Sequence, residues 1–357
     1  MSEWKIYKLG DIATFQTGKL NSNAAVSNGQ YPFFTCSPIT LSIDTWAFDK
    51  EAIILAGNNA EGNFSIKYYK GKFNAYQRTY IIEAMQGICD TKFLYYSLKI
   101  FLKHFKRLSQ GTSTKFLTAV ILRSIEISLP PLAEQKRIAD ILSAIDDKIE
   151  LNRRINANLE QQAQALYKEW FIAVEKDNWE EKRLGDIIEL YDSQRRPLSG
   201  QQRANMDKIY PYYGAASLMD YVDNYLFDGI YLLLGEDGTV SDSEGFPMLQ
   251  YVWGKFWVNN HAHILQGKNG YTTESLYILL KQTNVSSIIT GAVQPKISQA
   301  NLKSIPIKLP QIELLSNYNK IIKPLFEEIR NNSAQINQLS TLRDTLLPKL
   351  MSGEIDV

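Results

Sequence analysis

"LPPLAEQKRIADIL" (residues 129–142) lies near the middle of the 357-residue chain and decides how the rest of it is organised. Two prolines are followed by a charged turn and then by apolar residues at helical spacing. Pro131 suits the first turn of a helix, because the N–H that proline lacks would have no partner there, and Glu134 favours the positive end of the helix. The stretch therefore predicts that a long helix begins where the centre of a domain would be expected.

The apolar pattern continues well beyond this stretch. Alternating steps of four and three residues from Ile138 meet an apolar side chain at eight of ten positions, which is the pattern of a coiled-coil seam. The ten positions are Ile138, Leu142, Ile145, Ile149, Asn152, Asn156, Leu159, Ala163, Leu166 and Trp170. At about 1.5 Å per residue, a helix over residues 138–171 would be roughly 50 Å long.

An internal repeat with a period near 180 residues runs through the chain. "WKIYKLGDI" (4–12) returns as "WEEKRLGDI" (179–187), "YPFF" (31–34) returns as "YPYY" (210–213), and "LRSIEISLPPL" (122–132) returns as "LKSIPIKLPQI" (302–312). Both copies alternate short β-branched and aromatic runs with Gly, Asn and Asp turns, beside stretches of helical spacing. We therefore expect two α+β (mixed α/β) domains, each followed by a long helix. The predicted segments are 1–130 and 176–310 for the domains, and 131–175 and 311–357 for the helices.

The second helix repeats the seam of the first. Shifting the pattern by 180 residues gives Leu325, Ile329, Asn332, Ile336, Leu339, Arg343, Leu346 and Leu350, of which six are apolar. A single helix of this kind would be read as a surface helix packed on its own domain, whereas two matching seams favour pairing with each other.

Three residues interrupt the helix patterns. Asn152 and Asn332 share one seam position, where a buried amide would select the register at some cost in stability; two solvent-facing side chains are the alternative. Pro324 predicts a kink or a new helix start near residues 323–325, because proline lacks the interior N–H. Pro348 predicts an end or a bend in the last turn.

Composition limits the class of protein. With 45% hydrophobic residues we expect folded domains with a core, and no run of about 18 apolar residues exists. The N-terminus lacks the pattern of a signal peptide, and Cys36 and Cys89 match neither a CxxC pair nor a disulfide framework. We expect a soluble, cytoplasmic protein with reduced thiols. The net charge is +1, but residues 1–130 hold 15 basic and 9 acidic residues, and this excess weakly favours a phosphate-bearing partner.

The sequence contains no clear catalytic or metal-binding motif. The chain lacks GxxxxGK[ST] and GxSxG, and "LPPL" has leucines where an adenine methyltransferase loop has an amide and an aromatic ring. "DNWEEK", with Asp177, Glu180 and Lys182, is interpreted as a solvated charge cluster. "HAH", with His261 and His263, could present two imidazoles on one strand face near Glu236 and Asp237, yet we expect no metal site, because the repeat aligns the two histidines with Arg78 and Tyr80.

Two matched loops favour nucleic acid over a catalytic role. "GTSTK" (111–115) and "GAVQPK" (291–296) each start with glycine, end with lysine and precede the strand that leads into a long helix. Glycine lets the backbone approach a phosphate closely, and lysine supplies the charge. Ordinary turns are the alternative interpretation.

Together, the repeat, the "LPPLAEQKRIADIL" entry into a long helix and the C-terminal "LLPKLMSGEIDV" resemble the specificity (S) subunit of type I DNA restriction-modification systems. The resemblance covers the whole chain. It implies two pseudo-symmetric target recognition domains, separated by two long helices that pair as an antiparallel coiled coil. Each domain would read one half of a bipartite, asymmetric double-stranded DNA target, and the helices would set the spacer.

The resemblance also implies partners. This chain would have no catalytic activity and no cofactor of its own; S-adenosylmethionine, ATP and magnesium would belong to partner subunits. These would be methyltransferase (M) subunits, two of them, and restriction/translocase (R) subunits, with no membrane association. The docking candidates at the first helix entry are Pro130, Pro131, Leu132, Glu134, Gln135 and Ile138. The second entry, "LPQIELL", lacks the second proline and the Glu-Gln pair.

Base-reading residues vary within this family, so the candidates rest on loop position and donor chemistry. They are Lys19, Asn21, Asn23, Arg78 and Lys115 in the first copy, and Gln194, Arg195, Arg196, His261, Gln294 and Lys296 in the second. Because the second domain is slightly acidic, we expect a local basic patch formed by Arg195, Arg196 and Arg203. Two other functions compete with DNA reading: a coiled-coil scaffold whose α/β domains bind proteins, and a metal-dependent hydrolase that uses His261 and His263.

Overall fold

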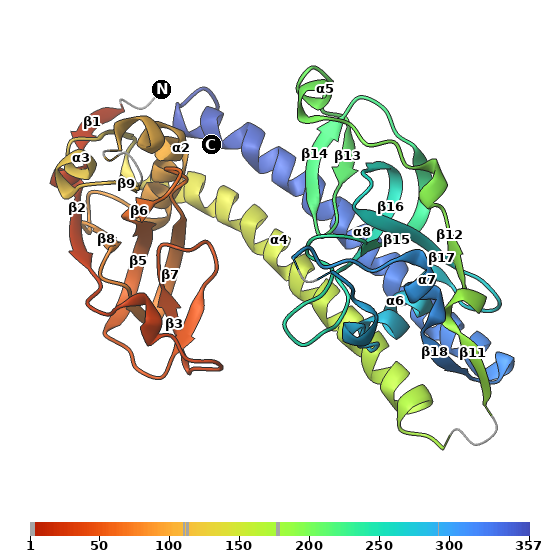
Figure 1. Cartoon of the computed structure of the whole chain (residues 1–357). Coiled ribbons are helices and arrows are strands. Elements are labelled where there is room, and N and C mark those ends of the chain that lie inside the picture. Colours follow the sequence, from red (N-terminus) through yellow and green to blue (C-terminus); the bar gives the residue numbers. More distant parts are fainter. Residues whose placement is uncertain (1–3, 110, 112–113, 176–178, 292) are drawn as a thin grey trace. The chain divides into compact units, whose positions relative to one another are not determined.

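The computed structural model describes residues 4–109, 111, 114–175, 179–291 and 293–357 (Figure 1). The chain divides into two compact units. Unit 1 comprises the residues up to 152 together with 334–357, and unit 2 comprises residues 153–333. Each unit therefore contains one α+β domain and a portion of both long helices.

The domain of unit 1 is built on a six-stranded sheet, and only the β3–β7 pair is parallel. The strand order is β2 (Ala13–Thr17), β8 (Thr79–Ala84), β5 (Phe48–Ala56), β7 (Ile66–Ala75), β3 (Tyr31–Phe34) and β4 (Leu41–Ile43). Two small sheets accompany it: β1 (Lys5–Lys8) with β10 (Glu126–Leu129), and β6 (Asn58–Asn59) with β9 (Lys115–Phe116). The short helices are α1 (Leu9–Ile12), η1 (Ser22–Ala24) and α3 (Ala119–Arg123).

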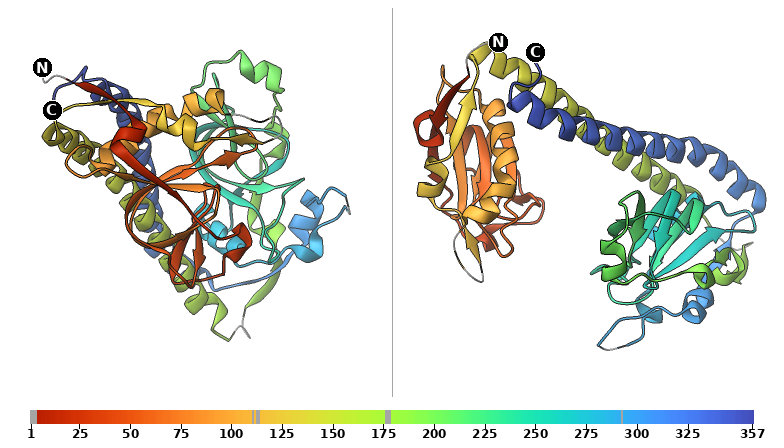
Figure 2. Two further views of the ribbon diagram at one scale, coloured as in Figure 1. Left: turned by 90° about the vertical axis from the view of Figure 1, so that its left-hand side faces the viewer. Right: turned by 90° about the horizontal axis from the view of Figure 1, so that it is seen from above.

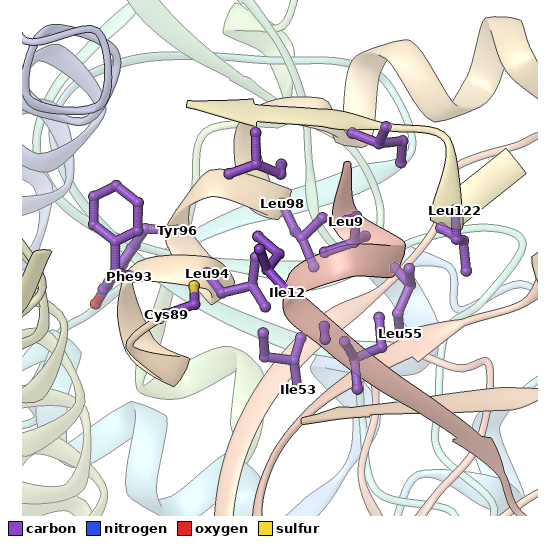
Figure 3. Close-up of a cluster of buried hydrophobic side chains, with 14 of the residues drawn as sticks. Leu9, Ile12, Ile53, Leu55, Cys89, Phe93, Leu94, Tyr96, Leu98 and Leu122 are labelled. Atoms are coloured by element: carbon purple, nitrogen blue, oxygen red, sulfur yellow. The ribbon is translucent and has the colours of Figure 1, made fainter. Parts of the chain in front are cut away.

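The core of this domain lies between the sheet and α2 (Thr91–Leu108), which packs on β5, β7 and β8 (Figure 2). Side chains alternate along β5, as the period of a strand requires. Ile53 and Leu55 face α2 and pack with Leu94 and Leu98 (Figure 3), whereas Ile54 packs on the opposite face of the sheet. Both faces of the central strand are thus buried.

Unit 2 repeats the six-stranded sheet, the helix packed on it and the β1–β10 pair of unit 1. Its strand order is β12 (Ile188–Leu190), β17 (Ala262–Gly267), β15 (Phe227–Gly235), β16 (Leu249–Val258), β13 (Tyr210–Tyr213) and β14 (Leu218–Val222), and β13–β16 is the parallel pair. The other elements are β11 (Glu180–Arg183) paired with β18 (Pro306–Leu309), α5 (Gly200–Ala204), α6 (Thr273–Lys281), α7 (Gln299–Ser304) and the short turns η3 (Leu184–Asp186), η4 (Asp192–Gln194) and η5 (Ser286–Ile288). The predicted duplication and fold class are confirmed.

The long helices are α4 (Leu132–Tyr167), which continues into the π-helical turn η2 (Lys168–Ile172), and α8 (Ile312–Met351). All ten predicted seam positions of α4 and all eight of α8 are buried or half-buried. The helices pair antiparallel within each unit, because the partner's number falls as the residue number rises (Figures 1 and 2). In unit 1, Arg343 binds Asp146 at 2.8 Å; in unit 2, the Tyr318 hydroxyl donates to the Ala163 carbonyl at 2.9 Å.

The two seam asparagines are buried, so their solvent-facing alternative is wrong. They do not bind each other. Asn152 Nδ2 donates to Gln335 Oε1 (2.6 Å) in unit 1, and Asn332 Nδ2 donates to Asn156 Oδ1 (3.0 Å) in unit 2. Each amide therefore donates to a polar side chain of the other helix in this register.

Of the two outcomes predicted at Pro324, the new helix start is wrong. α8 passes Pro324 without a new start. Pro324 and Lys320 are exposed, so water can bind the carbonyl that the proline leaves without a donor. Pro348 lies within one turn of the end of α8 at Met351, as expected. In the part of the chain that the structure describes, no helix is both long and apolar enough to span a bilayer.

We predict that Asn152→Leu raises the free energy of unfolding by about 1 kcal/mol, because Asn152 Oδ1 is buried and finds no hydrogen-bond partner among the described residues. Urea unfolding measures the effect. Asn158→Leu, on the exposed face of the same helix, is the control and should change stability by less than about 0.5 kcal/mol. Destabilisation by the Asn152 variant would contradict this account of the seam.

Candidate nucleic-acid interface

One end of the six-stranded sheet in unit 1 gathers loops from four parts of the sequence. Backbone hydrogen bonds connect them: Gln77 N–H to Leu20 carbonyl (2.9 Å), Gly57 N–H to Arg78 carbonyl (2.8 Å), and Leu117 N–H to Gly57 carbonyl (2.9 Å). We name this end the first loop edge, comprising residues 19–23, 57–59, 76–78 and 114–117. It contains all five candidates of the first copy: Lys19, Asn21, Asn23, Arg78 and Lys115.

Unit 2 forms the same edge with different side chains. Glu236 N–H binds the His261 carbonyl and Ile297 N–H binds the Glu236 carbonyl, both at 2.8 Å, in positions that match the bonds of Gly57 and Leu117. The second loop edge comprises residues 192–196, 236–238, 259–261 and 293–297. His263 lies opposite Leu234 as Tyr80 lies opposite Leu55, which confirms the alignment made from the repeat.

The first loop edge presents its polar side chains to solvent. Lys19, Asn21, Asn23 and Arg78 are exposed, and the Arg78 guanidinium lies over the Phe116 ring at 5.6 Å. Lys115 is half-buried and donates to the Gly111 carbonyl at 2.8 Å. Among the described residues, none of these three cations forms a salt bridge with a carboxylate, so this edge keeps its positive charge for a ligand.

Gly111 and Gly291 begin the two matched loops as predicted. Their φ angles are +102° and +87°, and an added Cβ would lie 2.1 Å from the Thr114 carbonyl oxygen and 2.3 Å from the Gln294 carbonyl oxygen, respectively. Both positions therefore require glycine. Residues 112, 113 and 292 of these loops lie outside the described residues, as does Asp177 of "DNWEEK".

Most charged side chains of the second loop edge form ion pairs with one another. Arg195, which we predicted to contact DNA, is one of them. Its side chain is only 14% exposed, pairs with Glu236 and donates to the Ala262 carbonyl (2.8 Å). Lys296 pairs with Glu236 at 3.3 Å, and His261 binds Asp237. Arg195 thus holds loops together and is not available for DNA.

The predicted basic patch of the second copy is also smaller than expected. Arg203 binds Asp220 at 3.1 Å and lies over the Tyr212 ring, so it supports the sheet. Gln194, Arg196 and Gln294 are exposed and keep their side chains available, and the Arg196 carbonyl accepts from Trp257 Nε1 at 2.6 Å. The second edge therefore offers mainly amides and one arginine.

His263 is fully buried, so the two histidines do not share an exposed face. Its Nδ1 contacts Asp192 Oδ2 at 2.6 Å, its Nε2 contacts the Ile297 carbonyl at 2.8 Å, and Glu236 lies 3.7 Å away. Asp192, Glu236 and His263 bring potential metal-ligand atoms within 4.8 Å of one another. Both imidazole nitrogens already have protein partners, and Arg195 and Lys296 pair with the carboxylates, so we interpret the group as an ion-pair network.

Burial by itself would raise the pKa of Asp192, but the hydrogen bond and charge of His263, the Ile264 N–H and Arg195 together hold that pKa below its ordinary value. Glu236 behaves in the same way: burial opposes, but Arg195, His263 and Lys296 lower its pKa. Both groups are therefore carboxylates at neutral pH.

Most side chains at the start of α4 are buried within unit 1. This corrects part of the prediction that they form a docking surface for a methyltransferase subunit. Gln135 and Ile138 are 1% and 0% exposed, and Pro130 and Glu134 are buried. Pro131 is exposed and Leu132 is half-buried, so only these two candidates offer surface to a partner in this conformation.

Gln135 joins the helix to the domain. Its Oε1 accepts from the Asp90 N–H (2.9 Å), and its Nε2 donates to the carbonyls of Ile88 (3.1 Å) and Pro130 (2.8 Å). In the second copy the matching residue is the buried Leu315, and the N–H of the helix cap Thr272 binds Ser275 Oγ at 2.9 Å instead. A local capping box thus satisfies in the second copy the helix-cap N–H that Gln135 binds in the first.

Gln77 also lies at the first loop edge, although the sequence did not make it a candidate for DNA contact. It is exposed, and its Nε2 donates to Asn21 Oδ1 at 3.1 Å. It lies next to Arg78 in the "NAYQRTY" stretch, so its position beside a predicted contact was the available signal.

Comparison with known proteins agrees with this geometry. Residues 1–161 and 176–341 each match the model of the type I restriction modification DNA specificity domain. The chain belongs to this family. The resemblance inferred from the sequence is confirmed, and each match contains one α+β domain and much of the helix that follows it.

Several relatives align with nearly the whole chain. The EcoDI type I specificity subunit of Escherichia coli is 28% identical, with 99% of this chain and 89% of that protein aligned. The HindI specificity subunit of Haemophilus influenzae is 23% identical, with 99% and 100% aligned. The crystal structure of the type I S subunit from M. genitalium has the same fold, with a TM-score of 0.62 at 20% identity over 98% of this chain and 96% of that one.

We predict that Gln135→Ala lowers the free energy of unfolding by about 1–3 kcal/mol, because it leaves a half-buried N–H, the buried Pro130 carbonyl and the Ile88 carbonyl without their partner. Chemical denaturation measures the loss. The neighbouring exposed Lys136→Ala is the control, with an expected change below about 0.5 kcal/mol. Equal effects of the two variants would show that Gln135 does not support the joint.

Acid should destabilise unit 2 through Asp192. Because its folded-state pKa is lowered, Asp192 stabilises the fold above its unfolded pKa of about 4, and this contribution is lost as pH falls through the lower folded value. Asp192→Asn should therefore flatten the dependence of the urea midpoint on pH below about 5. The exposed Asp207→Asn is the control; if its acid profile changes as much, the network is not responsible.

Proposed function

We propose that this chain is the DNA sequence-recognition subunit of a type I restriction-modification complex. Each loop edge reads one half of a bipartite target. The observation that carries the proposal is the duplicated edge: the same backbone scaffold is built twice in a DNA specificity family, with different side chains at matching positions. Arg78 against His261, and Phe116 against Lys296 paired with Glu236, make the half-sites unlike.

The reading chemistry differs between the two edges. Arg78 and Lys19 suit guanine O6/N7 or phosphate oxygens, whereas Gln194 and Gln294 suit adenine N6/N7. The antiparallel helix pair sets the spacing of the half-sites and docks methyltransferase subunits, with Pro131 and Leu132 as the exposed part of the first docking surface. Methyl transfer and cleavage, with S-adenosylmethionine, ATP and magnesium, belong to methyltransferase and restriction subunits in the cytoplasm.

Sequencing DNA methylation tests this proposal in cells that carry the chain with its methyltransferase partner. One split motif with a constant gap is expected. Replacing residues 178–310 with those of another family member should change one half of the motif only. No motif that depends on this chain, together with loss of DNA retention in the purified complex, would favour a protein-binding scaffold instead.

We predict that Arg78→Ala weakens DNA binding by the assembled complex about 10- to 100-fold, and relaxes the preference at one position of the first half-site. Competition binding with duplexes substituted in either half measures both effects. Lys103→Ala removes an exposed charge from α2 of the same domain and is the control. A uniform loss across all sequences would assign Arg78 to phosphate contact only.

A further inference from the structure

The helix that packs on the sheet ends differently in the two domains. In unit 1, α2 continues to Leu108, whereas α6, its counterpart in unit 2, ends at Lys281. Residues 100–115, which comprise the additional turns of α2 and the loop after them, hold four lysines and arginines and no acidic residue. The matching residues 282–296 hold one lysine and no acidic residue. Only the first domain therefore concentrates positive charge in this segment.

A lysine from another segment joins the last turn of α2. Lys106 and Arg107 lie in this turn, where the helix dipole favours positive charge. Lys115 belongs to the first loop edge, and the helix dipole does not account for its position. A Cβ at Gly62 would lie 3.0 Å from Lys106 Cγ and 3.4 Å from Lys115 Cγ, so both aliphatic stems pack over this glycine. We name Lys106, Arg107 and Lys115 the basic corner.

The charges of the basic corner are not neutralised within the described part of the chain. Lys106 and Arg107 are exposed, and Lys115 is half-buried. Among the described residues, none of the three forms a salt bridge with a carboxylate. Holding like charges close together costs electrostatic energy, which an anionic ligand would relieve.

Neutral groups hold the two lysines in place. Lys106 Nζ donates to Asn63 Oδ1 at 3.5 Å, and Lys115 Nζ donates to the Gly111 carbonyl at 2.8 Å. The Glu61 carboxylate accepts from the Nδ2 of the same Asn63 at 3.1 Å, but it forms no salt bridge with a described cation. The ammonium groups therefore keep their charge while their positions are restricted.

This chemistry fits the phosphates of a nucleic-acid backbone. Lysine supplies a point charge, and the guanidinium of arginine can bind two phosphate oxygens at once. The corner is continuous with the first loop edge, because Lys115 pairs with Asn59 between β9 and β6, and Arg78 lies over the adjacent Phe116 ring at 5.6 Å. Phosphate contacts position a protein on DNA, whereas base contacts specify the sequence.

We propose that Lys106, Arg107 and Lys115 bind the DNA backbone beside the first half-site irrespective of its sequence, so that the first domain supplies more of the salt-dependent affinity than the second. The inference rests on the proposed function. In unit 2, Lys296 is the lysine of the matching segment, and it pairs with Glu236 at 3.3 Å. Each phosphate that a free cation neutralises releases counterions, so the basic corner steepens the fall of affinity with salt.

The experiment uses the full chain in complex with its methyltransferase partner. Two duplexes of equal length are compared, one with the motif found by methylation sequencing and one without it. Fluorescence anisotropy measures the Kd of each between about 50 and 300 mM KCl. The double variant Lys106→Gln with Arg107→Gln should flatten the slope of log Kd against log salt by about 2 and weaken binding about tenfold. Both duplexes should be affected equally.

Two comparisons separate the basic corner from the net charge of the chain. Lys5→Gln with Lys8→Gln removes the same charge from exposed positions of β1 in the same domain, and should change the slope by less than about 0.5. Lys115→Gln should flatten the slope by about 1, whereas Lys296→Gln should change it less, because Glu236 already pairs with that ammonium. The urea midpoint of each variant checks its folding.

An unchanged slope in the double variant would overturn the proposal, as would an equal flattening in the β1 control. A loss confined to the duplex with the motif would also overturn it, by assigning the basic corner to base reading. Weaker assembly with the methyltransferase subunit, with unaltered DNA binding once assembled, would overturn it in favour of a protein contact. If the wild-type complex retains no DNA and yields no methylation motif, the proposed function itself fails.

Discussion

The structure depends on burying two apolar seams. α4 and α8 each present a stripe of aliphatic side chains, and the pairing of the two helices covers it in both units. This requirement explains the duplication, because each copy of the domain brings one helix and needs the other. In the observed register, the buried Asn152 and Asn332 each donate to a polar side chain of the other helix.

The two domains keep a common backbone and differ in the side chains at their loop edges. Matching bonds hold the same loops in both, yet Tyr80 and Thr17 occupy one copy where His263 and Asp192 occupy the other. A recognition protein benefits from this separation, because the contacts that define the fold are backbone bonds and buried aliphatic packing. Side chains at the edge can change without loss of the scaffold.

Loop position guided the choice of the candidate residues. It selected Lys19, Arg78 and Lys115, which lie at one edge of unit 1. It failed for Arg195, whose counter-ion Glu236 lies 41 residues away, and for Gln135, whose partners Ile88 and Asp90 precede it by more than 40 residues. In both cases the polar side chain looked available to a binding partner, because the groups that bind it within the fold are distant in the sequence.

The sequence by itself determined the repeat, the strand and helix elements, both seams and the glycines of the matched loops, because these depend on local periodicity and backbone freedom. Tertiary structure alone decided which polar side chains remain available and which asparagine partners which residue. It also decided that His263 is buried between Asp192 and the Ile297 carbonyl, and that Ser275 binds the helix-cap N–H in the second copy as Gln135 does in the first. These outcomes depend on which distant donors and acceptors meet in space, and no local pattern encodes that.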